Sequence, residues 1–170
     1  MARRISLREF QESLAQRLAS ARRGEARQAL LGVESGGAPW LLDLSDSGEV
    51  LPVPPLTTVP LTKPWFAGVA NVRGTLYSIV DFSAFRGGEP TPRNAETRLL
   101  LVGARHGINS ALLVDRTLGL KSIDDLEPMA VEGDPPAWAA SRRQDAQGRQ
   151  WTLLELRALL ADPAFLDVGS

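Results

Sequence analysis

Residues 65–82 read WFAGVANVRGTLYSIVDF and join a glycine-containing turn to a strongly apolar strand. Gly68 and Gly74 bracket Asn71 and Arg73, and glycine permits the backbone angles that tight turns require. Such a turn can present an amide and a planar guanidinium beside the edge of a β-sheet, which is a recognition geometry. The alternative is that Arg73 caps carbonyl groups within its own loop.

Short apolar runs separated by turn residues continue on both sides of this stretch, at the spacing typical of β-sandwiches and barrels. Glycine-containing turns such as Gly36-Gly37 and Arg86-Gly87-Gly88 punctuate the pattern. The pattern predicts strands at 28–34, 39–44, 49–53, 75–82, 97–103, 109–115 and 117–121, with a hairpin formed by 142–145 and 149–151. The fold is therefore expected to be mainly β.

Five of the twelve prolines lie between Pro52 and Pro64, so this segment cannot form a helix or a central strand. A proline-rich run can be a ligand for another module. A packed crossover is favoured instead by its interleaved apolar residues, which are Val53, Leu56, Val59, Leu61, Trp65 and Phe66. Strand-length runs on both sides of the crossover exceed the needs of one five-stranded barrel and predict two lobes.

Helices are predicted at the two ends of the chain. Ser6 and Glu9 have capping-box spacing, and an apolar stripe follows as far as Gly24. This amphipathic helix either docks on a partner or covers the core of its own domain. Thr152 and Glu155 repeat the spacing before a leucine stripe that Asp162-Pro163 should end.

Composition excludes several classes of site. The 170 residues contain no cysteine and a single histidine, His106, so neither a thiol nucleophile nor a cysteine or histidine metal cluster is expected. The net charge of -1 disfavours a nucleic-acid binder. Residues 1–27 form a basic extension, with seven arginines against three glutamates, which leaves -5 for the remainder. No secretory signal or membrane-length apolar run is present, which predicts a cytoplasmic protein without direct membrane insertion.

Catalytic candidates are weak. Asp81 and Asp115 each follow an apolar run and could form an acid/base pair, or could bond to turn amides at strand ends. Asp46-Ser47-Gly48 matches the short aspartic-protease triplet but lies where a hairpin turn belongs. His106 precedes Gly107 in a predicted exposed turn. We expect no enzyme activity and no cofactor or metal site.

Three segments resemble the CheW-type chemotaxis coupling proteins, and the first is Val59-Pro60, which is similar to the family's valine–proline step. Residues 68–81, with Gly68, Asn71, Arg73 and Gly74 before an apolar strand, are similar to the family's signature, and residues 111–120 are similar to its later strand pair. The resemblance implies two SH3-like five-stranded β-barrels and an adaptor between methyl-accepting chemoreceptors and a CheA-type histidine kinase, located at membrane-associated receptor arrays.

The chain also departs from the family pattern. Ser78 stands where proline is frequent, and Arg86-Gly87 replaces the usual leucine–glycine step. With its basic N-terminal helix, the chain resembles the PilI-type coupling proteins of type IV pilus systems, which implies control of twitching motility. The expected division is an extension at 1–27 and a CheW-like domain at 28–165.

The expected function is a non-catalytic adaptor, in which apolar β-edges provide affinity and Asn71 with Arg73 fixes orientation. The predicted partner-binding residues are Val69, Asn71, Arg73, Gly74, Val80, Asp81, Leu112 and Val114. The alternative is a small β-barrel nucleic-acid-binding protein, because such barrels bind single strands through basic, aromatic grooves.

Overall fold

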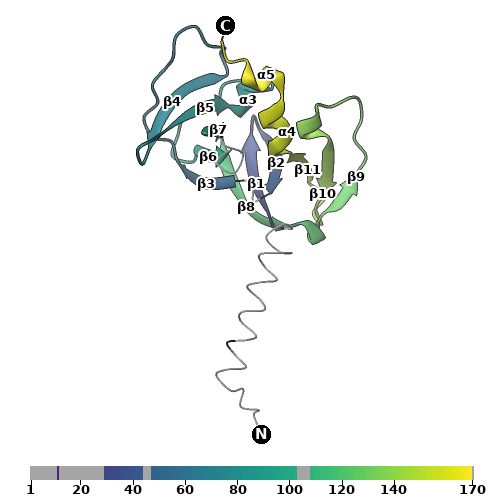
Figure 1. Cartoon of the computed structure of the whole chain (residues 1–170). Coiled ribbons are helices and arrows are strands. Elements are labelled where there is room, and N and C mark those ends of the chain that lie inside the picture. Colours follow the sequence, from purple (N-terminus) through teal and green to yellow (C-terminus); the bar gives the residue numbers. More distant parts are fainter. Residues whose placement is uncertain (1–10, 12–28, 44–46, 103–107, 170) are drawn as a thin grey trace.

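The computed structural model describes residue 11 and residues 29–43, 47–102 and 108–169. Its strands form two sheets that lie side by side (Figure 1). The six-stranded sheet has the order β8-β1-β2-β11-β10-β9, and the five-stranded sheet has the order β3-β6-β7-β5-β4. In chain order the strands are β1 (Ala29–Ser35), β2 (Ala38–Asp43), β3 (Ser47–Pro52), β4 (Phe66–Val72), β5 (Thr75–Asp81), β6 (Arg98–Val102), β7 (Ser110–Val114), β8 (Arg116–Ser122), β9 (Glu127–Met129), β10 (Ser141–Gln144) and β11 (Gln150–Leu154).

The helices in the described part of the chain are short. They are α3 (Phe82–Phe85), the 3-10 turns η3 (Ile123–Asp125) and η4 (Ala137–Ala139), α4 (Leu156–Ala161) and α5 (Pro163–Leu166). None of these helices is long and apolar enough to cross a membrane. Figure 1 shows α4 and α5 near the C-terminus, above the junction of the two sheets.

The prediction of a mainly β fold in two parts is confirmed, and one sheet has six strands instead of five. The parts are not divided at the proline-rich segment, because β3 precedes that segment and pairs with β6 after it. The six-stranded sheet combines the two ends of the described chain, since β2 pairs with β11 in parallel. Hydrophobic runs predict where strands lie. They do not predict which sheet a strand joins, because that depends on pairing between segments distant in sequence.

The proline-rich segment forms the packed crossover that its composition predicts. It joins β3 and β4, which lie at opposite edges of the five-stranded sheet. Val53 and Leu56 pack against a core of that sheet, and Trp65 packs against the larger core between the sheets. These side chains hold a segment that cannot pair as a central strand, whereas Val59 and Leu61, which were expected to pack with them, are 37% and 83% exposed.

Three local predictions were incomplete or wrong. β4 and β9 were not predicted, because Phe66–Val72 is rich in small residues and Glu127–Met129 is short and contains proline. The capping box at Thr152 does not begin the C-terminal helix. Thr152 pairs with Trp40 and Arg142 inside the six-stranded sheet, and α4 begins only at Leu156, so sheet pairing overrides the local helix signal.

Asp162 and Pro163 do end α4, and they also begin α5. The Asp162 side chain accepts a hydrogen bond from the Ala164 amide at 2.8 Å, and Pro163 occupies the first turn. The predicted N-terminal helix, the turn at Asp46 and His106 lie outside the described residues, apart from Gln11.

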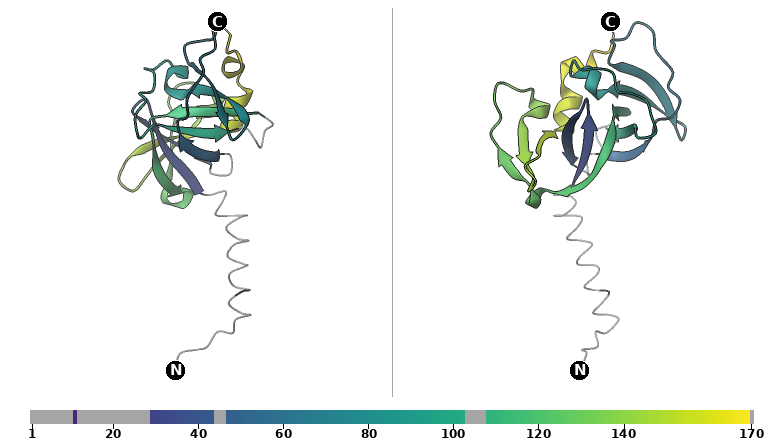
Figure 2. Two further views of the ribbon diagram at one scale, coloured as in Figure 1. Left: turned by 90° about the vertical axis from the view of Figure 1, so that its left-hand side faces the viewer. Right: turned by 180° about the vertical axis from the view of Figure 1, so that it is seen from behind.

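The largest core cluster joins the two sheets. It contains Leu31 and Trp40 from the six-stranded sheet together with Val80 and Leu112 from the five-stranded sheet, all buried. The chain passes from β7 to β8, and thus between the sheets, through the single residue Asp115. The right-hand view of Figure 2 shows this crossing from behind. The two sheets consequently share one apolar interior.

Candidate partner-binding site

The β4–β5 hairpin places Arg73 at an exposed tip. Val72 pairs with Thr75, so Arg73 and Gly74 form a two-residue loop with φ angles of 51° and 86°. Two positive φ angles are the mark of a type I′ turn, which matches the natural twist of a hairpin. The Asn71 Oδ1 accepts a hydrogen bond from the Gly74 amide at 2.9 Å and supports this turn.

The Arg73 guanidinium forms an ion pair with Glu49 of β3. The alternative that Arg73 caps carbonyls in its own loop is wrong, because its partner is a carboxylate 24 residues away. Hydrogen bonding to Arg73 lowers the pKa of Glu49, and the same bond raises the pKa of Arg73. The pair connects the hairpin tip to a strand at the other edge of the sheet, with 69% of the arginine side chain exposed.

Gly68 allows the crossover to lie directly against β4. The Thr57 amide donates to the Val69 carbonyl and the Val69 amide donates to the Thr57 carbonyl, both at 2.9 Å. Gly68 has a φ of 131°, and a Cβ atom there would lie 2.3 Å from the Thr57 oxygen. This position therefore requires glycine, and half-buried Val69 belongs to the covered edge.

The remaining predicted site residues lie inside the molecule. Val80, Leu112 and Val114 are buried in the core between the sheets, so their side chains support the surface without forming it. Asp81 is also buried and is the N-cap of α3. The structure thus brings Asn71, Arg73 and Gly74 together at one exposed tip and places the other residues beneath it or apart from it.

The two aspartates considered for acid/base chemistry have separate bonding roles. Asp81 accepts from the Thr91 amide and hydroxyl, each at 2.7 Å, and from the Ala84 amide at 3.2 Å. Asp115 accepts from the Gly37 amide at 3.3 Å. These contacts match the strand-end interpretation. In the described residues no group of three histidine, cysteine, aspartate or glutamate side chains could hold a metal ion.

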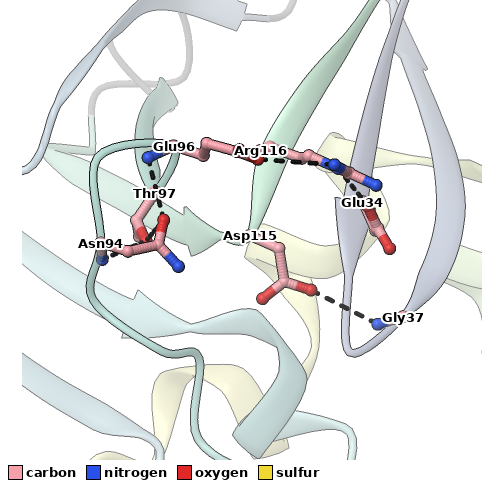
Figure 3. Close-up of polar contacts among 7 residues, drawn as sticks. All are labelled: Glu34, Gly37, Asn94, Glu96, Thr97, Asp115 and Arg116. Carbon is pink, nitrogen blue, oxygen red and sulfur yellow. Dashed lines mark hydrogen bonds and ion pairs between the residues drawn. The ribbon is translucent and has the colours of Figure 1, made fainter.

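A polar seam lies where the two sheets meet, and it is defined here as Glu34–Gly37, Arg86, Glu96, Asp115 and Arg116. Figure 3 shows Arg116 between Glu34 of β1 and Glu96 of the loop before β6. The hydrogen bond to Glu34 raises the pKa of Arg116. Glu34 and Arg116 are paired residues of β1 and β8, so of the two Arg116 contacts it is the one with Glu96, at 3.4 Å, that spans the two sheets.

Arg86, which follows α3, makes a second connection across the seam, to Ser35 of β1. Its guanidinium donates to the Ser35 carbonyl at 2.7 Å and to the Ser35 hydroxyl at 3.0 Å. The same group lies 4.9 Å from the centre of the Trp40 ring and 4.8 Å from that of Phe82. Burial lowers the pKa of Arg86, and the charge of Asp115 opposes that shift. The departure from the leucine expected at position 86 is thus accommodated by stacking and by hydrogen bonds.

Two cavities adjoin Arg86. One of about 590 Å³ follows the seam and is lined by Gly36, Asp115 and Arg116, and another of about 640 Å³ has aromatic walls that include Trp65 and Trp138. Sequence patterns did not single out either cavity. Their walls combine residues from distant segments, which local sequence patterns do not bring together. The one related signal in the sequence is that Arg86 departs from the family pattern.

Comparisons with known proteins agree with this architecture. Residues 29–164 match the model of the CheW-like domain. The chain is 31% identical over 145 residues to protein PilI of Pseudomonas aeruginosa, covering 82% of this chain and 79% of that protein. It is 24% identical over 139 residues to a probable chemotaxis protein CheW of Rhizobium etli, covering 78% and 87% of the two chains.

A solved structure shows the same fold. The crystal structure of the scaffolding protein TtCheW from Thermoanaerobacter tengcongensis superimposes with a TM-score of 0.64 at 19% identity, covering 76% of this chain and 89% of that chain. The domain match covers most of the described chain. The matched part contains the two sheets around a shared core, the crossover that depends on Gly68 and the exposed turn at Arg73. This chain belongs to the CheW-like family.

Proposed function

We propose that this chain is a non-catalytic cytoplasmic adaptor that couples a methyl-accepting chemoreceptor to a CheA-type histidine kinase at receptor arrays, with type IV pilus twitching motility as the output. Its membership of the CheW-like family and its likeness to PilI support this proposal. The observation that carries it is the exposed Arg73 tip, supported from below by Asn71.

An adaptor of this kind acts by proximity. When one protein holds receptor and kinase at the same time, their contact becomes effectively intramolecular, and a change in the receptor can reach the kinase. Arg73 suits such a role because a guanidinium forms two directed hydrogen bonds with a carboxylate or a pair of carbonyls. Its present partner, Glu49, is half-buried with 40% of its side chain exposed, and it can be exchanged for a group on another protein.

The test measures binding to the purified regulatory domain of the kinase, and kinase activity with a receptor fragment. Arg73→Ala and Arg73→Lys should each weaken binding, by about 1–4 kcal/mol for truncation of a central contact. Their melting temperatures should stay within about 2 °C of the wild-type value, because an exposed ion pair contributes little to stability.

Glu49→Gln is the matched control. It removes the ion pair and keeps Arg73, so binding should remain or increase. If Glu49→Gln weakens binding as much as Arg73→Ala does, the ion pair holds the hairpin in place and Arg73 does not contact the partner. Normal binding by a folded Arg73→Ala variant would reject the recognition role itself.

The alternative of a nucleic-acid binder is not favoured. Three cations of the described surface, Lys63, Arg73 and Arg116, are already paired with carboxylates. Phosphate binding would have to replace these bonds and would fall steeply with salt. A largely apolar interface with a kinase domain should instead persist from low to moderate salt.

A further inference from the structure

Leu61 lies at an exposed turn of the crossover in a backbone conformation that disfavours leucine. Its φ is 59°, and 83% of the residue is exposed. Pro60 followed by a residue of positive φ is the order found in a type II turn, where glycine or asparagine normally follows the proline. The left-handed region brings the Cβ atom of a residue other than glycine close to the following carbonyl oxygen, so Leu61 carries strain.

The Leu61 side chain is not buried, so burial of apolar surface does not offset this strain. The turn is held by its neighbours: the Thr62 hydroxyl donates to the Val59 carbonyl at 2.8 Å, and the Lys63 amide donates to the Val168 carbonyl at 2.8 Å. The Lys63 ammonium also contacts the Asp167 carboxylate at 2.7 Å. These bonds fix the turn, which exposes the apolar side chain of Leu61 next to the ion pair of Lys63 and Asp167.

The position of Leu61 connects it with the Arg73 tip. Among the described residues, Leu61 and Arg73 are the two residues other than glycine with positive φ. Both flank β4: the crossover pairs with β4 through Thr57 and Val69, and the hairpin tip follows Val72 at the far end of the strand. Strained backbone positions tend to occur at functional sites, and here two exposed ones precede and follow β4, an edge strand of the five-stranded sheet.

We infer that Leu61 is a preformed anchor that inserts into an apolar, uncharged pocket on the regulatory domain of the kinase, on the same interface as Arg73. The inference rests on the proposed function and extends it by naming a second contact and its chemistry. A convex leucine requires a concave apolar surface. Because Lys63 and Asp167 neutralise each other, the partner needs no charge at this point. Buried apolar anchors of this kind often dominate the energetics of an interface.

The experiment compares stability and kinase binding in four proteins. Leu61→Asn suits the left-handed conformation and removes the apolar side chain, so the melting temperature should rise by about 2–6 °C while affinity for the regulatory domain falls about tenfold or more. Leu61→Met keeps an apolar side chain and should bind within about threefold of wild type. Leu120→Asn is the control, since Leu120 of β8 is 63% exposed and has no positive φ.

Each outcome decides one point. Wild-type affinity in Leu61→Asn, or an equal loss in Leu120→Asn, overturns the anchor. A melting temperature that does not rise in Leu61→Asn overturns the strain on which the inference is built. If the wild-type protein does not bind the regulatory domain while Leu61→Asn is still stabilised, the proposed function fails and the assigned partner fails with it, although the strain is real.

Discussion

Replacing Gly68 by alanine should destabilise the protein more than the same change at any open glycine. The new Cβ would lie 2.3 Å from the Thr57 oxygen and 3.0 Å from its carbonyl carbon, so the crossover must move away from β4. That movement breaks the two Thr57–Val69 hydrogen bonds, each worth about 0.5–1.5 kcal/mol. A φ of 131° adds roughly 1–3 kcal/mol of backbone strain.

The combined loss is about 2–6 kcal/mol, a large part of the stability of an ordinary domain. Urea denaturation should show a lower midpoint with an unchanged slope. Gly74→Ala is the matched control, because Gly74 has a φ of 86° with no atom within 4 Å of the added carbon, and it should cost only about 1–2 kcal/mol. Equal losses in the two variants would refute the close approach at Gly68.

Two further predictions concern the seam and the six-stranded sheet. Arg86→Leu leaves both Ser35 acceptors without their donor and removes the stacking on Trp40, so it should lower the stability by about 1–3 kcal/mol in urea, and an unchanged midpoint would contradict this. The pKa of Asp145 is lowered, mainly by its bond from the Trp151 indole at 3.0 Å. A lowered folded-state pKa stabilises the fold above the unfolded-state value, and this contribution is lost as the pH falls through the folded-state pKa. Acid unfolding followed below about pH 4 should therefore be less steep in Asp145→Asn than in wild type, and identical pH profiles would show that the bond contributes nothing.

Most strands could be predicted because their apolar residues are dense and their turns are marked by glycine. β5 and β7 lie within a residue or so of the predicted ranges, since Ile79–Val80 and Leu112–Val114 are buried whichever strands they pair with. The strand order could not be predicted in this way. The parallel pairing of β2 with β11 joins residues more than one hundred positions apart, and hydrophobic periodicity contains no information on partners.

The candidate site was predictable only where it is local. Asn71, Arg73 and Gly74 lie within four consecutive residues of a turn marked by glycine, so sequence alone could place them at an exposed tip. The Glu49 partner of Arg73 and the Ser35 partner of Arg86 lie 24 and 51 residues away and depend on the folded arrangement. Leu61 was wrongly expected to pack within the crossover, because the backbone conformation that leaves it exposed cannot be read from residue type.

The shared core limits how an adaptor with this architecture can respond to a receptor. Val33 and Trp40 from one sheet pack with Val80 and Val114 from the other, and all four are buried. Opening the seam would expose these side chains to water at roughly 25 cal/mol for each Å² of apolar surface. Such a cost opposes any hinge between the sheets. The Arg73 tip, held on the five-stranded sheet, and the Leu61 turn, bonded to the C-terminal segment at Val168, should therefore be displaced as one body when a partner binds, so that rigid placement and not lobe opening would transmit the signal.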